Sequence, residues 1–289
     1  MKKQIFILFL LISTVSRAQF YYNDVLGVRE TNAQMKSYVA NGVKTVSATG
    51  ITPEGSKATD YTEFREIREN GRALRITVIR ELEKTLTYSR FDEKGRISQM
   101  TDSSSNVVNT TNYQYDTNDR LVKVETLVDD PGGDFKETET HLWQYNSQGQ
   151  PEKMWKIRSR KGVLEGTDSL EIRFVPDEKG NPGEEHSYKK GVETEMLYYY
   201  FDEKGRVTDI VRYNTKVKKL VPDMILTYDD NDHVIQKITS TSGNYNGKVT
   251  WIGYNIWRFI FNDKGLKTKE ALFDNNQEIQ GKIEYAYTF

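Results

Sequence analysis

Cysteine is absent from this chain of 289 residues, and proline occurs only six times. Without cysteine the fold cannot rely on disulfide bonds, and the chain cannot carry the lipidated cysteine of a lipoprotein. A hydrophobic core must therefore supply the stability of the fold, and a chain of this length is long enough to bury one.

Histidine is also scarce, with only His141, His186 and His233, which lie far apart in the sequence. None has a metal-ligand type of residue two or four positions after it, which favours half-buried or surface histidines on strands. The sequence also has no serine nucleophile elbow and no glycine-rich phosphate loop. We therefore predict no catalytic residue, no metal site and no cofactor.

Two pairs of adjacent carboxylates keep one enzymatic alternative open. Glycoside hydrolysis needs two carboxyl groups that flank a cleft, and Glu184 with Glu185, or Asp229 with Asp230, supply such groups. Both pairs lie at or near expected turns, where acidic residues serve solvation and hairpin closure. A carboxylate-dependent, glycan-active enzyme is accordingly an alternative and not the main prediction.

Long hydrophobic runs are missing except at the start of the chain. Lys2 and Lys3 precede the apolar residues 5–12, and Ser16-Arg17-Ala18 has the small-x-small pattern of a cleavage site. We predict a signal peptide over residues 1–18 that is cleaved after Ala18, and an exported protein that is periplasmic, on the cell surface or extracellular. The apolar run is too short to span a bilayer, so no integral membrane helix is expected.

A strong charge of either sign is missing as well. The chain has 41 Lys and Arg and 42 Asp and Glu, and loss of Lys2, Lys3 and Arg17 takes the formal net charge from −1 to −4. Nucleic-acid binding calls for a basic stripe. A nucleic-acid partner is therefore not expected.

What the sequence does contain is a repeated turn motif: an aromatic residue, Asp or Asn, polar residues, Gly or Asp, and often Arg followed by an aliphatic residue. Residues 91–97 read FDEKGRI, and residues 201–207 read FDEKGRV. Asp and Asn bond to their own backbone and Gly adopts positive φ freely, which closes a hairpin at little steric cost. The predicted structural turn positions are Gly71, Gly95, Asp119, Gly149, Gly180, Gly205, Asp232 and Gly265.

The spacing of these positions averages about 28 residues, enough for two strands and two turns. Between the turns apolar residues alternate, as at Leu74, Ile76 and Val78. We predict a mainly β fold: a repetitive antiparallel β-hairpin meander that forms an extended or spiralling sheet. Residues 51–289 would form this repeat domain of about eight units, and residues 19–50 a cap segment with one short helix over residues 30–42.

Residues 113–124, YQYDTNDRLVKV, resemble a YD repeat, the Tyr-Asp hairpin unit of bacterial RHS proteins, wall-associated proteins and teneurins. The resemblance covers about residues 60–289 at the level of the repeat. It implies a β-sheet fold, and some members of the family are associated with carbohydrate binding. The chain has neither a long repeat array nor a C-terminal toxin domain, and it is more similar to small exported envelope proteins with degenerate repeats.

Aromatic residues are the candidate ligand-binding groups. Rings exposed on a sheet form a platform for sugar faces, whereas buried rings belong to the core. The candidates are Trp143, Tyr145, Trp155, Trp251 and Trp257.

The remaining hypotheses concern partners and location. The last strand, residues 283–289, has one charge and no proline, so it is a candidate edge for a partner protein. The main prediction is an exported, non-enzymatic binding or structural module whose partner is a polysaccharide or a protein. The first alternative is an outer-membrane β-barrel, although residues 65–69 place charges on both faces of a strand.

Overall fold

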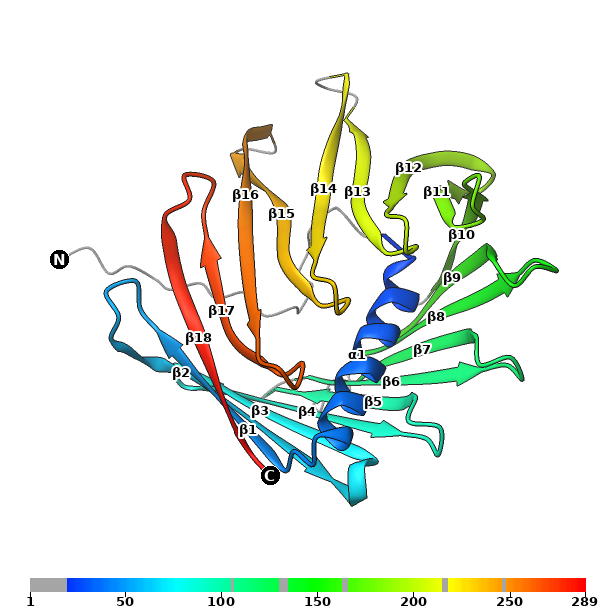
Figure 1. Cartoon of the computed structure of the whole chain (residues 1–289). Helices are drawn as coiled ribbons and strands as arrows, with labels where there is room; N and C mark the ends of the chain where they lie inside the picture. Colours follow the sequence, from blue (N-terminus) through cyan, green and yellow to red (C-terminus); the bar gives the residue numbers. More distant parts are fainter. Residues whose placement is uncertain (1–19, 105–106, 130–134, 163–165, 215–217, 246–247) are drawn as a thin grey trace. The chain divides into compact units, whose positions relative to one another are not determined.

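The computed structural model describes residues 20–104, 107–129, 135–162, 166–214, 218–245 and 248–289. It confirms the predicted fold class, because the described chain is mainly antiparallel β-structure with one N-terminal helix (Figure 1). The predicted signal peptide lies outside the described residues.

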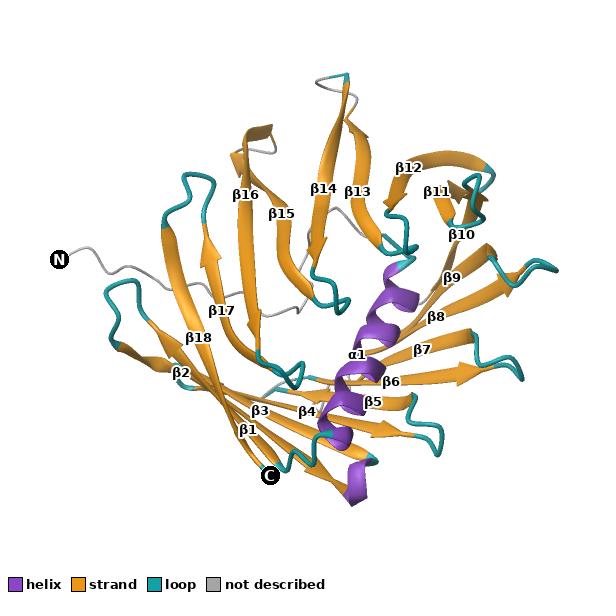
Figure 2. Ribbon diagram, viewed as in Figure 1, coloured by secondary structure: helices purple, strands orange, loops and turns teal. Residues whose placement is uncertain are grey.

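The elements follow the hairpin pattern, with strands joined by short turns (Figure 2). In chain order they are α1 (Asn23–Ala40), β1 (Thr45–Ile51), β2 (Lys57–Arg68), the 3₁₀ turn η1 (Glu69–Gly71), β3 (Ala73–Arg80), β4 (Glu83–Phe91), β5 (Ile97–Ser103), β6 (Val108–Tyr115), β7 (Leu121–Asp129), β8 (Phe135–Tyr145), β9 (Pro151–Gly162), β10 (Gly166–Pro176), β11 (Pro182–Lys189), β12 (Val192–Phe201), β13 (Val207–Asn214), β14 (Lys219–Tyr228), β15 (Val234–Tyr245), β16 (Lys248–Phe261), β17 (Lys267–Phe273) and β18 (Ile279–Thr288).

The chain divides into two compact units, whereas a single repeat domain was predicted over residues 51–289. Among the described residues, unit 1 comprises Phe20, Ala48–Thr59 and Tyr200–Ala286. Unit 2 comprises Tyr21–Ser47, Asp60–Tyr199 and Tyr287–Phe289. Unit 2 therefore contains α1 and most of the strands from β2 to β12, and unit 1 contains β13 to β17.

The sheet of unit 2 has two chemically different faces, because neighbouring side chains of a strand point to opposite sides. On one face Trp143 of β8 pairs with Met154 of β9, which pairs with Ile172 of β10, and all three side chains are buried. This face packs against α1, as Figure 1 shows. On the other face Leu142 pairs with Trp155, and neither is buried. We call these the helix face and the free face of unit 2.

Unit 1 is built by the same rule. Val207 and Ile210 of β13 are buried, and so are Leu272 of β17 and Ile283 of β18. Trp257 of β16 pairs with Leu272. In β17 and β18 the buried residues lie on one face of the sheet, whereas β13 has buried residues on both faces.

The helix ends where the sequence predicts, but it begins earlier than predicted. At the C-terminal end the N–H of Gly42 donates to Val39 and the N–H of Val43 donates to Tyr38, and Gly42 has φ of +67°. The predicted start near residue 30 is wrong, since α1 begins at Asn23. A side chain from a distant strand caps the N-terminal end of α1, as described below. The residues next to the start of the helix therefore carry no capping signal.

The C-terminal strand does not end as a free edge, which corrects the hypothesis that it docks a partner protein there. Within unit 2 the N–H of Lys44 donates to the carbonyl of Thr288 at 2.8 Å. The hydroxyls of Thr45 and Thr288 lie 2.7 Å apart, and the ammonium of Lys44 donates to the carbonyl of Phe289 at 3.1 Å. The backbone groups available to a partner at these last residues are therefore already used by the chain itself.

Candidate functional site

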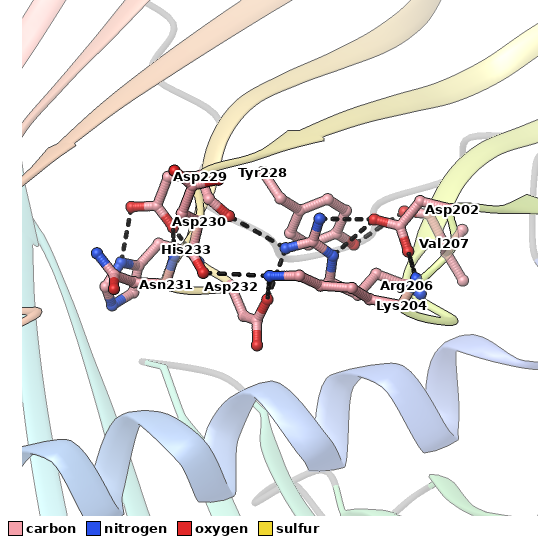
Figure 3. A network of polar contacts seen from close by, with 10 residues as sticks. All are labelled: Asp202, Lys204, Arg206, Val207, Tyr228, Asp229, Asp230, Asn231, Asp232 and His233. Carbon is pink, nitrogen blue, oxygen red and sulfur yellow. Dashed lines mark hydrogen bonds and ion pairs between the residues drawn. The ribbon is translucent and has the colours of Figure 1, made fainter.

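The hairpin turns share one backbone-bonding pattern that begins at their Asp or Asn. In the turn of unit 1 drawn in Figure 3, Asp202 Oδ1 accepts the N–H of Lys204 at 3.0 Å and the N–H of Arg206 at 2.9 Å. One carboxylate oxygen thus satisfies two backbone donors that the tight turn leaves unpaired. The residues that accept in this way are Asp92, Asp116, Asn146, Asp177, Asp202, Asp229, Asn262 and Asp274.

The predicted turn positions all have positive φ, as the hairpin interpretation requires. The values run from +64° at Asp119 to +85° at Gly180. Gly71 differs from the others, because it belongs to η1 and a Cβ there would lie 2.6 Å from Val39 Cγ2 of α1. The turn that begins at Asp274 was missed because Gln277, with φ of +63°, stands where the motif has Gly.

The arginine of the motif connects one turn to the next. Arg206 donates through Nε to Asp202 of its own turn at 2.7 Å and through Nη1 to Asp232 of the following turn at 2.6 Å (Figure 3). Its guanidinium also lies 4.5 Å from the ring centroid of Tyr228, the aromatic residue that precedes the following turn. One side chain therefore bonds two successive hairpins, by ion pairs and by a cation–π contact.

The same arrangement occurs in unit 2. Arg96 bonds to Asp92 and to Asp119, and its guanidinium lies 4.3 Å from the ring of Tyr115. In the next turn Arg120 bonds to Asp116 and lies 4.8 Å from the ring of Tyr145, one of the candidate ligand-binding residues.

The aromatic residue completes the connection. The hydroxyl of Tyr115 donates to the carbonyl of Ile97, and that of Tyr228 donates to the carbonyl of Val207, both at 2.8 Å. Ile97 and Val207 are the aliphatic residues that end the preceding motif. We call this repeated set of contacts the turn ladder. It gives a structural role to the aromatic residue, the Asp, the Gly and the Arg of the motif.

The ladder perturbs the ionisation of its members. Burial raises the pKa of Tyr115 to about 12. Burial also opposes ionisation of Asp92, but the hydrogen bonds from the Arg96 side chain and from backbone N–H groups outweigh it and lower the pKa of Asp92. Asp202 has a lowered pKa for the same reasons. The turn carboxylates are thus held in the charged form that the ladder uses.

A shallow hollow of about 410 Å³ lies beside two turns of unit 1. Its lining includes His233 and Phe261, whose rings stack with centroids 4.4 Å apart. His233 Nδ1 lies 3.0 Å from Asp229 Oδ2, so this histidine takes the arginine's place in the ladder. Within the part of the chain that the structure describes, no group of three or more His, Cys, Asp or Glu residues is placed to hold a metal ion.

A second polar cluster, in unit 2, fixes the start of α1. The carboxylate of Glu185 on β11 accepts the N–H groups of Tyr21 and Tyr22, each at 3.0 Å, and the hydroxyl of Tyr199 at 2.6 Å. An anion at a helix N-terminus satisfies unpaired N–H groups and interacts favourably with the helix dipole. Glu185 is almost fully buried. Burial raises its pKa and outweighs these hydrogen bonds, which lower it.

Beside Glu185 the first turn of the helix is bound to β8. Asp24 Oδ2 lies 2.6 Å from His141 Nδ1 and accepts the indole N–H of Trp143 at 3.1 Å. His141 Nε2 lies 3.1 Å from Glu139 Oε1, and Arg158 of β9 donates to Glu139 Oε2 at 2.6 Å. We call Asp24, Glu139, His141, Trp143 and Glu185 the helix clasp. It was not predicted from sequence, because residues more than 110 positions apart form it.

Within unit 2 the structure does not place the candidate ligand-binding aromatics Trp143, Tyr145 and Trp155 on one exposed surface. Trp143 is only 4% exposed and belongs to the clasp, and Tyr145 is half-buried with its hydroxyl bonded to Leu121. Trp155 is half-buried on the free face of unit 2, and Trp257 lies in unit 1. The side chain of Trp251 lies outside the described residues.

The candidate carboxylate pairs are not arranged as a catalytic dyad. Glu184 and Glu185 point to opposite faces of β11, where Glu184 contacts His186 and Glu185 caps α1. Asp229 accepts the backbone N–H of His233 within its own turn, and its other carboxylate oxygen contacts His233 Nδ1. Neither pair therefore supplies two carboxyl groups that face one cleft.

Comparisons with known proteins give the following results. No family model and no curated protein matches the chain. Among solved structures, a porin-like protein from Bacteroides uniformis is 10% identical, with a TM-score of 0.32, and the match covers 85% of this chain and 98% of that one. A porin-like protein from Bacteroides vulgatus is 9% identical, with a TM-score of 0.32 and 85% and 99% covered. The Tc holotoxin pore of Photorhabdus luminescens is 10% identical, with a TM-score of 0.32, and the match covers 79% of this chain but 16% of the toxin chain.

These likenesses establish neither a family nor a function for the chain. No family model supports the YD-repeat resemblance. Within the described ranges, no helix is both long and apolar enough to cross a membrane.

Proposed function

We propose that the chain is an exported, non-enzymatic protein of the cell envelope whose β-hairpins form a structural or binding module. The observation that carries this proposal is the turn ladder, because the repeated polar residues bond to one another and to the backbone of neighbouring hairpins. A motif used in this way gives the sheet its rigidity and leaves the strand surfaces to face the surroundings.

The chemistry of the free face of unit 2 supports a surface in contact with water. Lys153, near the start of β9, and Arg173, near the end of β10, both pair with Glu171, at 3.0 Å and 2.8 Å. Lys123 pairs with Glu125 on β7 at 2.7 Å. Charged side chains on a lipid-facing surface are destabilising, by about 0–1 kcal/mol near the membrane interfaces and about 2–4 kcal/mol at the midplane, so these charges favour water.

The second candidate is an outer-membrane β-barrel. What favours it is the strand arrangement: the described residues form 18 strands, an even number, and chain neighbours such as β2 and β3, β3 and β4, or β8 and β9 pair antiparallel. Outer-membrane barrels of bacteria are built from an even number of such strands. The two candidates differ in what the free face contacts.

Cell fractionation separates the two candidates. We expect the protein in the soluble periplasmic or extracellular fraction, with a β-rich far-ultraviolet spectrum in the absence of detergent. A Leu142→Glu variant should remain folded and soluble, because Leu142 is 37% exposed on the free face. Leu197→Glu is the matched control and should fail to fold, because Leu197 is fully buried.

Recovery only from detergent-solubilised outer membrane would contradict the soluble module. Loss of membrane assembly in the Leu142→Glu variant would then assign a lipid-facing role to this face. Either result is read directly from the fraction in which the protein appears.

If the module binds polysaccharide, Trp155 is the candidate residue on the free face of unit 2. The ammonium of Lys153 lies 5.8 Å from the centroid of the Trp155 ring, and Trp155 pairs across the sheet with Glu171. Aromatic faces bounded by polar groups suit the apolar faces of sugars. We expect retention on at least one cell-wall or capsular polysaccharide, lost in Trp155→Ala and kept in Tyr88→Ala, the control on the same face. No retention of the wild-type protein on any of them would exclude the glycan role.

A further inference from the structure

The imidazole of His141 is bonded through both ring nitrogens to carboxylates. Nδ1 lies 2.6 Å from Asp24 Oδ2 of α1, and Nε2 lies 3.1 Å from Glu139 Oε1 of β8. A neutral imidazole has one N–H and donates only once, whereas an imidazolium donates from both nitrogens. Both contacts are therefore made as hydrogen bonds only when the ring is protonated.

The two carboxylates depend on His141 to different degrees. Glu139 also pairs with Arg158 at 2.6 Å and with Lys156 at 3.1 Å, so it keeps cationic partners when the histidine is neutral. Asp24 has the indole N–H of Trp143 as its other partner in the clasp. After loss of the proton one N–H remains, so Asp24 keeps at most a hydrogen bond to a neutral ring and loses its cationic partner in the clasp, whereas Glu139 keeps two cations. The attachment of α1 is therefore weakened more than the sheet.

Charged and titratable groups from several elements face this site. They are Asp24 of α1, Tyr21 before the helix, Tyr113 of β6, Glu139 of β8, Lys156 and Arg158 of β9, Glu185 of β11 and Tyr199 of β12. The phenols are held neutral, since burial raises the pKa of Tyr21, Tyr113 and Tyr199. His141 is thus the group of the clasp whose charge changes most readily above neutral pH.

We propose that the helix clasp is a proton-dependent latch in which charged His141 joins Asp24 of α1 to the sheet, and in which loss of that proton releases the start of the helix. Release would free the N–H groups of Tyr21 and Tyr22 from Glu185 and uncover Trp143. The device acts within unit 2 and is independent of the proposed function.

The direction of the pH dependence follows from the shift of the histidine. Burial lowers the pKa of His141, but Asp24 and Glu139 outweigh burial and raise it to about 9. A group whose pKa is higher in the folded than in the unfolded state stabilises the folded state when it is protonated. For histidine this stabilisation is complete below the unfolded pKa of about 6.5, and it is lost as the pH rises to the folded pKa. The clasp should therefore weaken between about pH 6.5 and about pH 9.

Two measurements on the mature wild-type protein test the latch. Nuclear magnetic resonance of the His141 ring should give a pKa of about 9. Hydrogen exchange of the amides at residues 21–28, corrected for base catalysis, should show a local opening constant that rises by up to about tenfold per pH unit in that window and levels off above it.

Variants separate the latch from general loss of stability. In His141→Gln, opening of residues 21–28 should already be elevated at pH 7 and independent of pH. His186→Gln is the matched control: His186 also contacts two glutamates, Glu184 and Glu193, but lies on the free face, so its profile should match the wild type.

If His141→Gln does not fold, Asp24→Asn provides the second test, because it keeps the side-chain shape and should lower the pKa of His141. A wild-type His141 that titrates near its usual value, or helix protection that stays constant up to pH 10, would overturn the proposal. So would a His141→Gln profile that follows the wild type.

Discussion

Each residue of the repeated motif has a definable physical task. The Asp accepts two backbone N–H groups, the Gly supplies positive φ, and the Arg reaches the next turn. The task of the Gly was predictable, because few residues tolerate that conformation. The task of the Arg was not, because its partners Asp232 and Tyr228 lie in another hairpin.

Replacing a turn glycine by valine should strain the turn. Gly95 and Gly205 have φ of +72° and +74°, and a Cβ at Gly95 would lie 3.8 Å from Lys36, so the cost there comes from the backbone and not from a clash. We expect each Gly→Val change to lower the free energy of unfolding by about 1–3 kcal/mol. Urea unfolding measures it, and wild-type stability in both variants would argue against positive φ at the turns.

Acidification should weaken the turns. Asp92 and Asp202 have lowered pKa values in the folded protein, so their stabilising effect is complete above the unfolded value of about 3.9 and is lost as the pH falls below it. Unfolding free energy should therefore drop between about pH 5 and pH 2. In Asp92→Asn, which keeps the Oδ1 acceptor as Asn146 does, part of this pH dependence should disappear. An unchanged dependence would show that Asp92 does not contribute.

At the scale of the element, the helix shows where local sequence is insufficient. Its C-terminal end was predictable from Gly42, which adopts the expected positive φ. Its start was not predictable, because Tyr22 provides no side-chain cap and Glu185 of β11 supplies the acceptor. Strands such as β8 and β9 were predictable from their alternation, since one face of each packs in the core.

The middle of the helix offers a stabilising substitution. Gly27 lies within α1, and a Cβ added there would have nothing within 4 Å. Gly27→Ala should raise the free energy of unfolding of unit 2 by about 0.5–1 kcal/mol, because glycine is a poor helix former and no neighbour must move. Thermal unfolding checks this, and a destabilised variant would mean that α1 is not helical at this position.

At the scale of the whole molecule, the same ladder recurs in both compact units. Arg96 contacts Asp119 and Tyr115 in unit 2, and Arg206 contacts Asp232 and Tyr228 in unit 1. Sequence could indicate that the hairpins repeat. It could not indicate that the chain divides into two units, because the boundary passes between Tyr199 and Tyr200, inside β12.

The most direct test of the account is a pair of double-mutant cycles across the ladder, one in each unit. The first combines Arg96→Met with Tyr115→Leu, and the second combines Arg206→Met with Tyr228→Leu, with stability measured by urea unfolding. Because each arginine stacks on the tyrosine of the next hairpin, both double variants should lose less stability than the sum of their single variants. Simple additivity in both cycles would contradict the claim that the motif joins successive hairpins.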